Sequence, residues 1–245
     1  YSAAISACER DADWEAALAL LASMRWAFLE PDTISYSAAM SACEKGCEWQ
    51  GAVSLLDTMI WAGPKPDTIC FSAAMSACEK GAEWQMALSL LMAMSWAVIE
   101  PNCISYNAAI GACENAAEWR NAIALFAAMD TVALEPDTFS YSSAISACEK
   151  GFEWQAALAL LIEMGLALLR RDAISYNAAI IACEKGADWR QTLALFTAMG
   201  REDLEPNYIS YNVAISACEK GADLRKAISL LAVTRRADRH LQEHC

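Results

Sequence analysis

Proline and glycine are scarce in this sequence, which contains six and ten of them among its 245 residues. Since 56% of the residues are hydrophobic, this scarcity excludes an intrinsically disordered chain. Glu, Gln, Asp or Ser interrupt the apolar residues every few positions, so no run of about eighteen apolar residues is available to cross a bilayer. We therefore expect a folded, soluble protein that has no membrane partner.

Histidine is almost absent, and both copies, His240 and His244, lie near the end of the chain beside Cys245. No nucleophile with a neighbouring base can be recognised, nor a pair of carboxylates in a defined pocket. Cys43 and Cys47 form an isolated C-x3-C, and neither this pair nor the terminal group supplies four zinc ligands. The sequence thus predicts no enzyme, no metal site and no cofactor.

Basic residues are in the minority, because 18 Lys and Arg stand against 31 Asp and Glu. The resulting net charge of -13 disfavours non-specific binding to polyanions. It does not decide the matter alone, since the placement of the charges also counts.

An aromatic residue recurs every 35 residues, and the length of 245 is seven times 35. The seven copies are Tyr1, Tyr36, Phe71, Tyr106, Tyr141, Tyr176 and Tyr211. This period indicates stacked repeats, each of which buries its apolar faces against its neighbours. We expect a single array over residues 1–245, with units that start near residues 1, 33, 68, 103, 138, 173 and 208 and with incomplete or divergent first and last units. Because the chain opens on Tyr1, part-way into a repeat, we expect it to be part of a longer protein.

Each unit is predicted to contain two helices. In the second unit, the first helix runs from about Ile34 to Glu44, with Asp32 or Thr33 as N-cap and Gly46 as the left-handed residue that ends it. The second helix begins near Glu48 and carries an apolar stripe at helical spacing. The members of the stripe are Trp49, Ala52, Val53, Leu56, Met59 and Ile60. The predicted fold class is an all-α solenoid.

The first helix has two different faces when its residues are placed 100° apart. Its packing stripe consists of Tyr36, Ala39, Met40 and Cys43. A second stripe consists of Ile34, Ser37, Ser41 and Lys45, and its copies keep an apolar residue, a Ser or Asn, a small residue and usually a cation. This second face is either a solvated surface or a place where a ligand lies, and the pattern alone leaves both open.

Two further columns favour structural roles. Seven cysteines share one repeat position, where helices stacked about 9–10 Å apart are too distant for disulfides, so we expect buried thiols in a reducing compartment. They are Cys8, Cys43, Cys78, Cys113, Cys148, Cys183 and Cys218. A tryptophan column, with Trp14 and Trp49 as its first copies, leads the apolar stripe of the second helix, which favours a core role over base stacking.

Several motifs together resemble the pentatricopeptide repeat family of the pure 35-residue type. They are Y-[SN]-x-A-[IM] at the start of the first helix, C-E-K-G at its end, A-x-x-L-[LF]-x-x-M in the second helix, and P-[DN] before the next unit. The resemblance covers the whole chain and implies a right-handed α-solenoid superhelix of seven stacked helix–turn–helix repeats.

The resemblance also implies a function. Such arrays bind single-stranded RNA along the inner face, one nucleotide per repeat, in a mitochondrion or plastid. The expected role is organellar RNA processing, stability or editing, exerted by occupying a site on the RNA. The alternative is a helical-repeat scaffold for protein–protein interaction.

By this resemblance, two residues of each unit read one base: the residue after the opening Tyr and the residue after the Pro that ends the unit. The pairs are Ser2 with Asp32, Ser37 with Asp67, Ser72 with Asn102, Asn107 with Asp137, Ser142 with Asp172, and Asn177 with Asn207. An ionised Asp only accepts hydrogen bonds and suits guanine and uracil, whereas Asn also donates and suits adenine and cytosine. Ser leaves room for a purine, and Asn in the same place favours a pyrimidine. The implied RNA is GGAUG followed by C or U.

Two more columns take roles from the resemblance. The apolar residue two before the Tyr sandwiches neighbouring bases, and its copies are Ile34, Ile69, Ile104, Phe139, Ile174 and Ile209. The cation that closes the first helix contacts phosphates, and its copies are Arg10, Lys45, Lys80, Lys150, Lys185 and Lys220, with Asn115 in the fourth unit. The alternative explanation for these cations is the favourable field at a helix C-terminus. Two acidic columns, which start at Glu9 and Asp13, are expected to lie mostly off the inner face.

The pattern is broken in two places. Arg171 stands where the other units have Pro, and the last unit offers Asn212 with Gln242, so the seventh base is undefined. After Leu231 the chain becomes more basic, which fits a terminal cap, a phosphate-binding tail or a truncated eighth unit.

Overall fold

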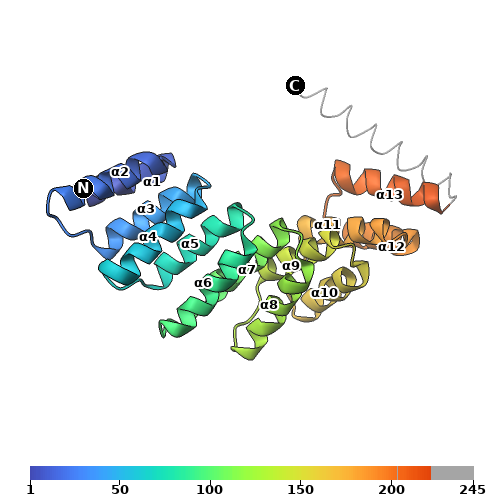
Figure 1. Cartoon of the computed structure of the whole chain (residues 1–245). Coiled ribbons are helices and arrows are strands. Elements are labelled where there is room, and N and C mark those ends of the chain that lie inside the picture. Colours follow the sequence, from blue (N-terminus) through green and yellow to red (C-terminus); the bar gives the residue numbers. More distant parts are fainter. Residues whose placement is uncertain (203, 222–245) are drawn as a thin grey trace, which may run out of the picture. The chain divides into compact units, whose positions relative to one another are not determined.

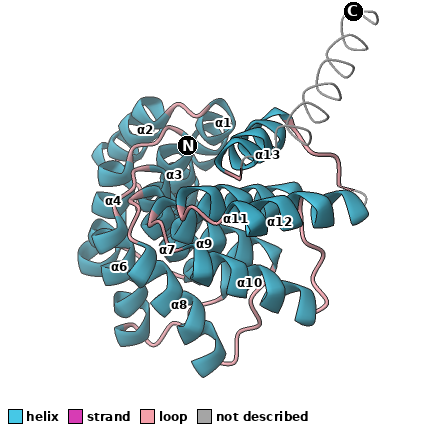
Figure 2. Ribbon diagram, turned by 90° about the vertical axis from the view of Figure 1, so that its right-hand side faces the viewer, coloured by secondary structure: helices cyan, strands magenta, loops and turns pink. Residues whose placement is uncertain are grey.

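The computed structural model describes residues 1–202 and 204–221, which form thirteen α-helices joined by loops and contain no strand (Figure 1). Figure 2 shows the same helices coloured by secondary structure. None of the described helices is long and apolar enough to span a membrane.

The helices come in pairs that follow the 35-residue period, and they fall into two compact units. Unit 1 covers Tyr1–Pro136 and contains α1 (Ser2–Asp11), α2 (Trp14–Trp26), α3 (Thr33–Lys45), α4 (Trp49–Ala62), α5 (Thr68–Lys80), α6 (Trp84–Trp96), α7 (Cys103–Asn115) and α8 (Trp119–Thr131). Unit 2 covers Asp137–Cys245, and its described helices are α9 (Thr138–Lys150), α10 (Trp154–Leu166), α11 (Ala173–Lys185), α12 (Trp189–Arg201) and α13 (Tyr208–Lys220). The tail after Leu231, with His240, His244, Cys245 and the reader Gln242, lies outside the described residues.

The first helices of the repeats form one layer within each unit. In unit 1, α1 packs against α3, α3 against α5, and α5 against α7, while α2, α4 and α6 each contact the first helix of their own repeat and that of the next. In unit 2, α9 packs against α11, which packs against α13, and α10 and α12 lie beside them in the same manner. The expected all-α repeat solenoid is thereby confirmed, and its right-handed sense stays a prediction.

The first helices begin where an Asp or Asn side chain caps them. In α3, Oδ1 of Asp32 accepts a hydrogen bond from the backbone N–H of Ser35 at 2.9 Å, and the Asp32 backbone is extended. Because the first N–H groups of a helix have no partner inside it, such a cap stabilises the helix by about 1 kcal/mol. The cap fixes the start of the helix at Thr33, one residue earlier than expected.

The packing stripe of the first helix is confirmed. Tyr36 is 2% exposed, and Ala39, Met40 and Cys43 are fully buried. A buried side chain the size of Met contributes about 1.5–3 kcal/mol relative to an exposed one. The equivalent aromatic residues Phe71, Tyr106, Tyr141 and Tyr176 are buried as well, whereas Tyr1 in the first repeat is 51% exposed.

The stripe of the second helix holds with one exception. In α4, Ala52, Leu56 and Met59 are buried, and Trp49 and Val53 are half-buried. The expectation for Ile60 is wrong, because this side chain is 50% exposed and Leu55 is buried instead. Since α4 packs against both α3 and α5, its buried face is turned toward Leu55.

The expectation that Gly46 is the left-handed residue is also wrong. Gly46 has φ -80°, and the following Cys47 has φ 58°. Glycine fits this position for a different reason, because a Cβ atom on Gly46 would lie 2.4 Å from Cδ1 of Trp14 in the preceding repeat. The equivalent Ala116 shows that one repeat accommodates a Cβ there. The same contact joins Gly81 to Trp49, where the added Cβ would lie 2.6 Å from Cδ1. The tryptophan column therefore packs against the next repeat, as the favoured core role predicts.

The cysteine column is buried from Cys43 to Cys218, and Cys8 at the edge of the array is half-buried. Burial raises the pKa of the Cys43 thiol to about 11 and that of Cys78 to about 12. These thiols are therefore protonated and pack as small apolar groups.

Candidate nucleic-acid interface

The second residue of each predicted base-reading pair is the N-cap of the first helix in the next repeat. Its Oδ1 accepts a hydrogen bond from the backbone N–H three residues further on, at 2.8 to 3.0 Å. The capping residues are Asp32, Asp67, Asn102, Asp137, Asp172 and Asn207. An N–H donor requires an oxygen, so the cap fixes which way each Asn amide points. The other atom is then Oδ2 in Asp, which accepts, or Nδ2 in Asn, which donates.

Asp32 is a pure acceptor. Hydrogen bonds from the Ser35 hydroxyl and from the Ser35 backbone N–H lower the pKa of Asp32 below its ordinary value of 3.8. Asp32, Asp67 and Asn207 are exposed, so their side chains are accessible to a ligand.

In four of the six predicted base-reading pairs, a buried serine lies between the two residues. In the third pair, the hydroxyls of Ser72 and Ser105 are 3.4 Å apart, and the Ser105 hydroxyl donates to Oδ1 of Asn102 at 3.0 Å. The same link joins Ser2 to Ser35 at 2.9 Å, Ser142 to Ser175 at 2.9 Å, and Asn177 to Ser210 at 2.6 Å. The reasoning from sequence missed these serines, although a Ser three residues after the cap is a visible signal of a capping interaction.

The expected sandwich residues are exposed at every copy. Ile34, Ile69, Ile104, Phe139, Ile174 and Ile209 have exposed fractions of 65%, 64%, 61%, 50%, 64% and 50%. These large apolar side chains, exposed at one repeat position, are available to a ligand.

In unit 1 the structure brings these groups together in one groove of about 290 Å³ between repeats. The groove is lined by Ser41, Glu44, Thr68, Ile69, Ser72, Ala73, Ser76, Asn102 and Ile104. It contains the whole third base-reading pair, Ser72 and Asn102, and two neighbouring sandwich residues, Ile69 and Ile104. The fourth pair has Asn107 in unit 1 and Asp137 in unit 2, so its joint reading of one base stays a prediction.

The predicted phosphate-binding lysines form ion pairs with glutamates of the preceding repeat. Lys45 pairs with Glu9 at 3.1 Å, Lys80 with Glu44 at 3.1 Å, Lys185 with Glu149 at 2.8 Å, and Lys220 with Glu184 at 2.5 Å. We call this column the Lys–Glu ladder. The lysine side chains are 32–46% exposed, so a phosphate can reach them but shares each one with a carboxylate. Arg10, in the first repeat, and Lys150, at the end of α9, occupy the equivalent positions.

The expectation that the acidic column lies off the inner face is wrong for Glu44. This residue lines the groove that holds Ser72 and Asn102, while its carboxylate accepts from Lys80. Glu184 lies in a comparable place, because it accepts a hydrogen bond from Ser216 at 2.9 Å as well as from Lys220. The acids accompany the small residues of the first-helix face.

Comparison with protein families decides what kind of repeat this is. A model of the pentatricopeptide repeat domain matches residues 54–116 and 159–220, just over half of the chain, and a model of the single PPR repeat matches residues 34–64 and 139–166. The chain belongs to the pentatricopeptide repeat family. No curated protein matches the sequence of this pentatricopeptide repeat chain.

Solved pentatricopeptide repeat structures share the fold. The chain is similar to the pentatricopeptide repeat protein PPR10 from maize, with 24% identity and a TM-score of 0.72 over 96% of this chain and 34% of that one. PPR10 in complex with an 18-nucleotide psaJ RNA element has 18% identity and a TM-score of 0.74 over 97% of this chain and 38% of that one. The PPR domain of Arabidopsis thaliana protein-only RNase P 1 in complex with tRNA has 14% identity and a TM-score of 0.62 over 66% of this chain and 86% of that domain. The chain spans little more than a third of the length of PPR10.

Two residues that break the pentatricopeptide repeat pattern, Asn115 and Arg171, make contacts of their own. Asn115, in place of the ladder lysine, donates through Nδ2 to the backbone carbonyl of Glu79 at 2.9 Å. Arg171, in place of Pro, donates to the Leu161 carbonyl at 3.1 Å and pairs with Glu202. Arg171 thus links the loop before α11 to Leu161 in α10 and to Glu202, and Asp172 still caps α11.

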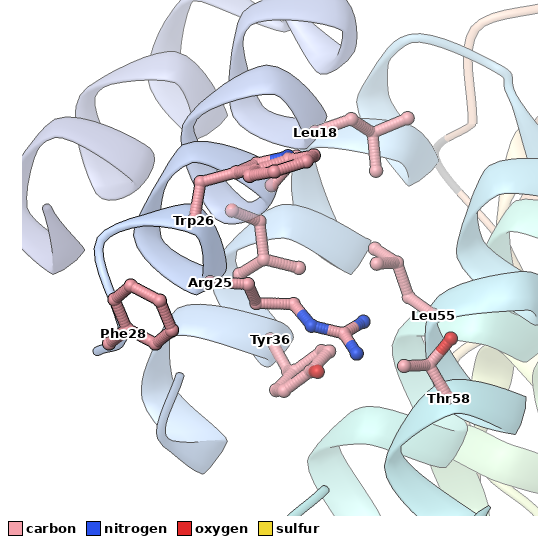
Figure 3. A pocket seen from close by; sticks show the side chains of 9 residues that line it. Leu18, Arg25, Trp26, Phe28, Tyr36, Leu55 and Thr58 are labelled. Carbon is pink, nitrogen blue, oxygen red and sulfur yellow. The ribbon is translucent and has the colours of Figure 1, made fainter. Parts of the chain in front are cut away.

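A different hollow lies between the second helices α2 and α4 of the pentatricopeptide repeats, with a volume of about 520 Å³ (Figure 3). Figure 3 shows the Arg25 side chain extending across it toward Thr58. At its edge, Trp26 is 85% exposed and Phe28 is 97% exposed. Among the described residues, no group of three or more His, Cys, Asp or Glu side chains is placed to hold a metal ion.

Proposed function

We propose that this chain binds single-stranded RNA sequence-selectively, one nucleotide per repeat, on the face of its first helices. The observation that carries the proposal is the groove in which Ser72 and Asn102 lie together with Ile69 and Ile104. A nucleotide base has a polar edge and two apolar faces, and this groove offers hydrogen-bonding and apolar side chains in one place. The RNA-bound structures of PPR10 and of the RNase P 1 domain support the proposal through their shared fold.

The base for each pair follows from the atom that the cap leaves for the ligand. Nδ2 of Asn102 donates and suits the N1 acceptor of adenine, whereas Oδ2 of Asp32 accepts and suits the ring N–H of guanine. Applied to all six pairs, this chemistry and the size of the first reader give GGAUG followed by C or U, read 5′ to 3′ from the amino end. The exposed isoleucines separate neighbouring bases.

The charges set a limit on affinity. With a net charge of -13 and at least four ladder lysines already paired, few cations are available to displace counterions from RNA. The affinity should therefore depend less steeply on salt than the number of basic residues suggests, and base contacts should supply a large share of it.

We place the biological role in organellar RNA metabolism, in a mitochondrion or plastid, as is typical of the family. A bound array acts by occupancy: it masks a site, blocks a nuclease or holds a hairpin open. This chain is not proposed to catalyse a reaction.

Fluorescence anisotropy with labelled RNA tests the proposal at the third pair. GGAUGC and GGGUGC differ only at the third nucleotide, opposite Ser72 and Asn102, and each is measured at low and physiological salt. The wild-type protein should prefer the RNA with A by about tenfold, since leaving one buried polar edge unpaired costs about 1–3 kcal/mol. Asn102→Asp should reverse this preference, because Asp caps α7 equally well but accepts instead of donating.

Asn207→Asp is the matched control, because it makes the same change at the cap of α13. It should leave the preference at the third nucleotide unchanged. The proposal is wrong if neither RNA binds at low salt, or if Asn102→Asp binds both RNAs with the wild-type preference.

The second candidate function is a scaffold for protein partners, and three tryptophans favour it. Trp26, Trp61 and Trp96 share one repeat position at the ends of α2, α4 and α6, and are 85%, 87% and 85% exposed. Exposed aromatic residues are frequent at protein interfaces. Replacing all three by Ser should not affect RNA selectivity if RNA is the ligand of the first-helix face.

A further inference from the structure

The serines between the base-reading residues form a buried column of their own. Ser35, Ser105, Ser175 and Ser210 are each 0% exposed, and each lies three residues after a cap. The Ser105 hydroxyl donates to Asn102 at 3.0 Å, and the Ser175 hydroxyl donates to Asp172 at 2.5 Å. We call these four residues the bridging serines.

The number of protons determines which hydroxyl donates in this bridge and which accepts. A hydroxyl has one proton, and in the first pair the ionised carboxylate of Asp32 can only accept, so the Ser35 proton points to Asp32. The contact of 2.9 Å between Ser2 and Ser35 then uses the proton of Ser2. The first reader is therefore linked to the second reader through Ser35, and its hydroxyl oxygen can still accept a hydrogen bond.

The second repeat pair lacks this bridge. Cys70 occupies the place of the serine, fully buried, and Oδ1 of Asp67 accepts from the Cys70 backbone N–H at 2.9 Å. The Ser37 hydroxyl donates to the carbonyl of Ile34 in its own helix at 3.0 Å. A thiol is a weak donor and acceptor, so Cys70, whose thiol hydrogen-bonds the Asp67 side chain, holds the two readers less firmly than a serine hydroxyl would.

We propose that the bridging serines are positioning residues that set base discrimination by fixing both readers of a pair, and that the pair Ser37 and Asp67, next to Cys70, discriminates less than the others. The inference rests on the proposed RNA binding. It adds a third position to the two that read the base, one that touches no base itself.

The test changes the bridge at two pairs in opposite directions. Ser105→Ala removes the hydroxyl of the third pair but keeps the backbone N–H that caps α7 at 2.9 Å, and Cys70→Ser supplies a hydroxyl to the second pair. For each protein, anisotropy measures the affinity for four RNAs that differ only at the second nucleotide and four that differ only at the third.

Ser105→Ala should lower the preference for A at the third nucleotide about fivefold, which is the value of one net hydrogen bond of about 1 kcal/mol. Its preference at the second nucleotide should not change. Cys70→Ser should raise the preference for G at the second nucleotide by a similar factor, a gain that a loss of folding cannot produce. Ser105→Cys, which copies the natural residue at position 70, should behave like Ser105→Ala.

The outcomes separate this inference from the proposed function. If the wild type selects bases at both positions and neither variant changes the ratios, the serines are structural only and the inference is wrong, while RNA recognition stands. If the wild type shows no selectivity among these RNAs, both fail.

Discussion

Glu79 offers a sharp test of the electrostatics of the Lys–Glu ladder, because its ladder partner is missing. The position that holds a lysine in the neighbouring repeats is Asn115, which contacts only the backbone of Glu79. The Glu79 carboxylate lies so close to Gly111 that a Cβ there would be 2.6 Å from Oε1. Burial, with the nearby charges of Glu114 and Glu44, raises the pKa of Glu79 from its ordinary 4.5 to about 7, although Lys80 opposes the change.

The sign of the effect on stability follows from linkage. The folded state holds the Glu79 proton more tightly than the unfolded state, so stability falls as the pH rises from 4.5 to about 7 and is constant above that range. At about 1.4 kcal/mol for each pH unit, the full difference is about 3 kcal/mol. Glu79 is only half-buried, and screening by solvent reduces the expected penalty to about 1–2 kcal/mol.

Glu79→Gln should therefore raise the free energy of unfolding by about 1–2 kcal/mol at pH 8 and change it little at pH 5. Urea denaturation followed by circular dichroism at both pH values measures this difference. Glu184→Gln is the matched control from the same repeat position. Hydrogen bonding to Lys220 lowers the pKa of Glu184, so this carboxylate stabilises the fold above pH 4.5 and loses its contribution as the pH falls through the lowered pKa.

The two variants should thus have opposite signs at pH 8, with Glu184→Gln less stable than the wild type. The reasoning is refuted if Glu79→Gln is no more stable than the wild type at pH 8, or if it gains as much at pH 5.

Asn115→Lys should complete the ladder, lower the pKa of Glu79 and stabilise the protein at pH 8 by up to about 1 kcal/mol, and a denaturation series over pH would show a flatter dependence than in the wild type. Gly81→Ala should destabilise by about 1–3 kcal/mol, since the new Cβ meets the Trp49 ring while φ of -81° suits alanine. Ala82→Gly, one residue further, should stabilise by up to about 1 kcal/mol because Ala82 has φ 56°. Equal effects of these two changes in urea denaturation would contradict the assignment of the left-handed position.

Much of the fold could be predicted because the sequence repeats its constraints. Tyr36, Met40 and Cys43 are spaced for one helix face, and the same spacing returns every 35 residues, so stacking is the only way to bury all copies. The N-cap at Asp32 was equally visible, since a short acceptor side chain directly precedes an apolar period.

The residues that were misread or missed depend on contacts across repeats. Glycine can serve either a positive φ or a close approach, and only the ring of Trp14 against Gly46 shows which of the two applies. The partner of Lys45 is Glu9, a residue from the preceding repeat, and spacing within one helix gives no sign of it. The bridging role of Ser105 likewise needs Ser72 and Asn102 from two different helices.

The Lys–Glu ladder also makes the proposed RNA binding compatible with a net charge of -13. Glu44 lines the groove of the third pair, and an unpaired carboxylate there would repel a phosphate backbone. Lys80 pairs with Glu44, so the groove is closer to neutral than the composition suggests. Exchanging a carboxylate for a phosphate on such an exposed lysine gains little, because either pair contributes roughly 0–1 kcal/mol.

The lysines thus cancel the charge of the acids beside them, and in the proposed RNA complex selectivity would come from the capping residues and the exposed isoleucines. At the one described place where the ladder lysine is replaced by Asn115, burial compensates. With a pKa of about 7, the Glu79 carboxyl is half protonated at neutral pH, so it carries less negative charge than an exposed glutamate. The Lys–Glu ion pairs and the partial protonation of Glu79 thus both reduce the negative charge on the face of the first helices.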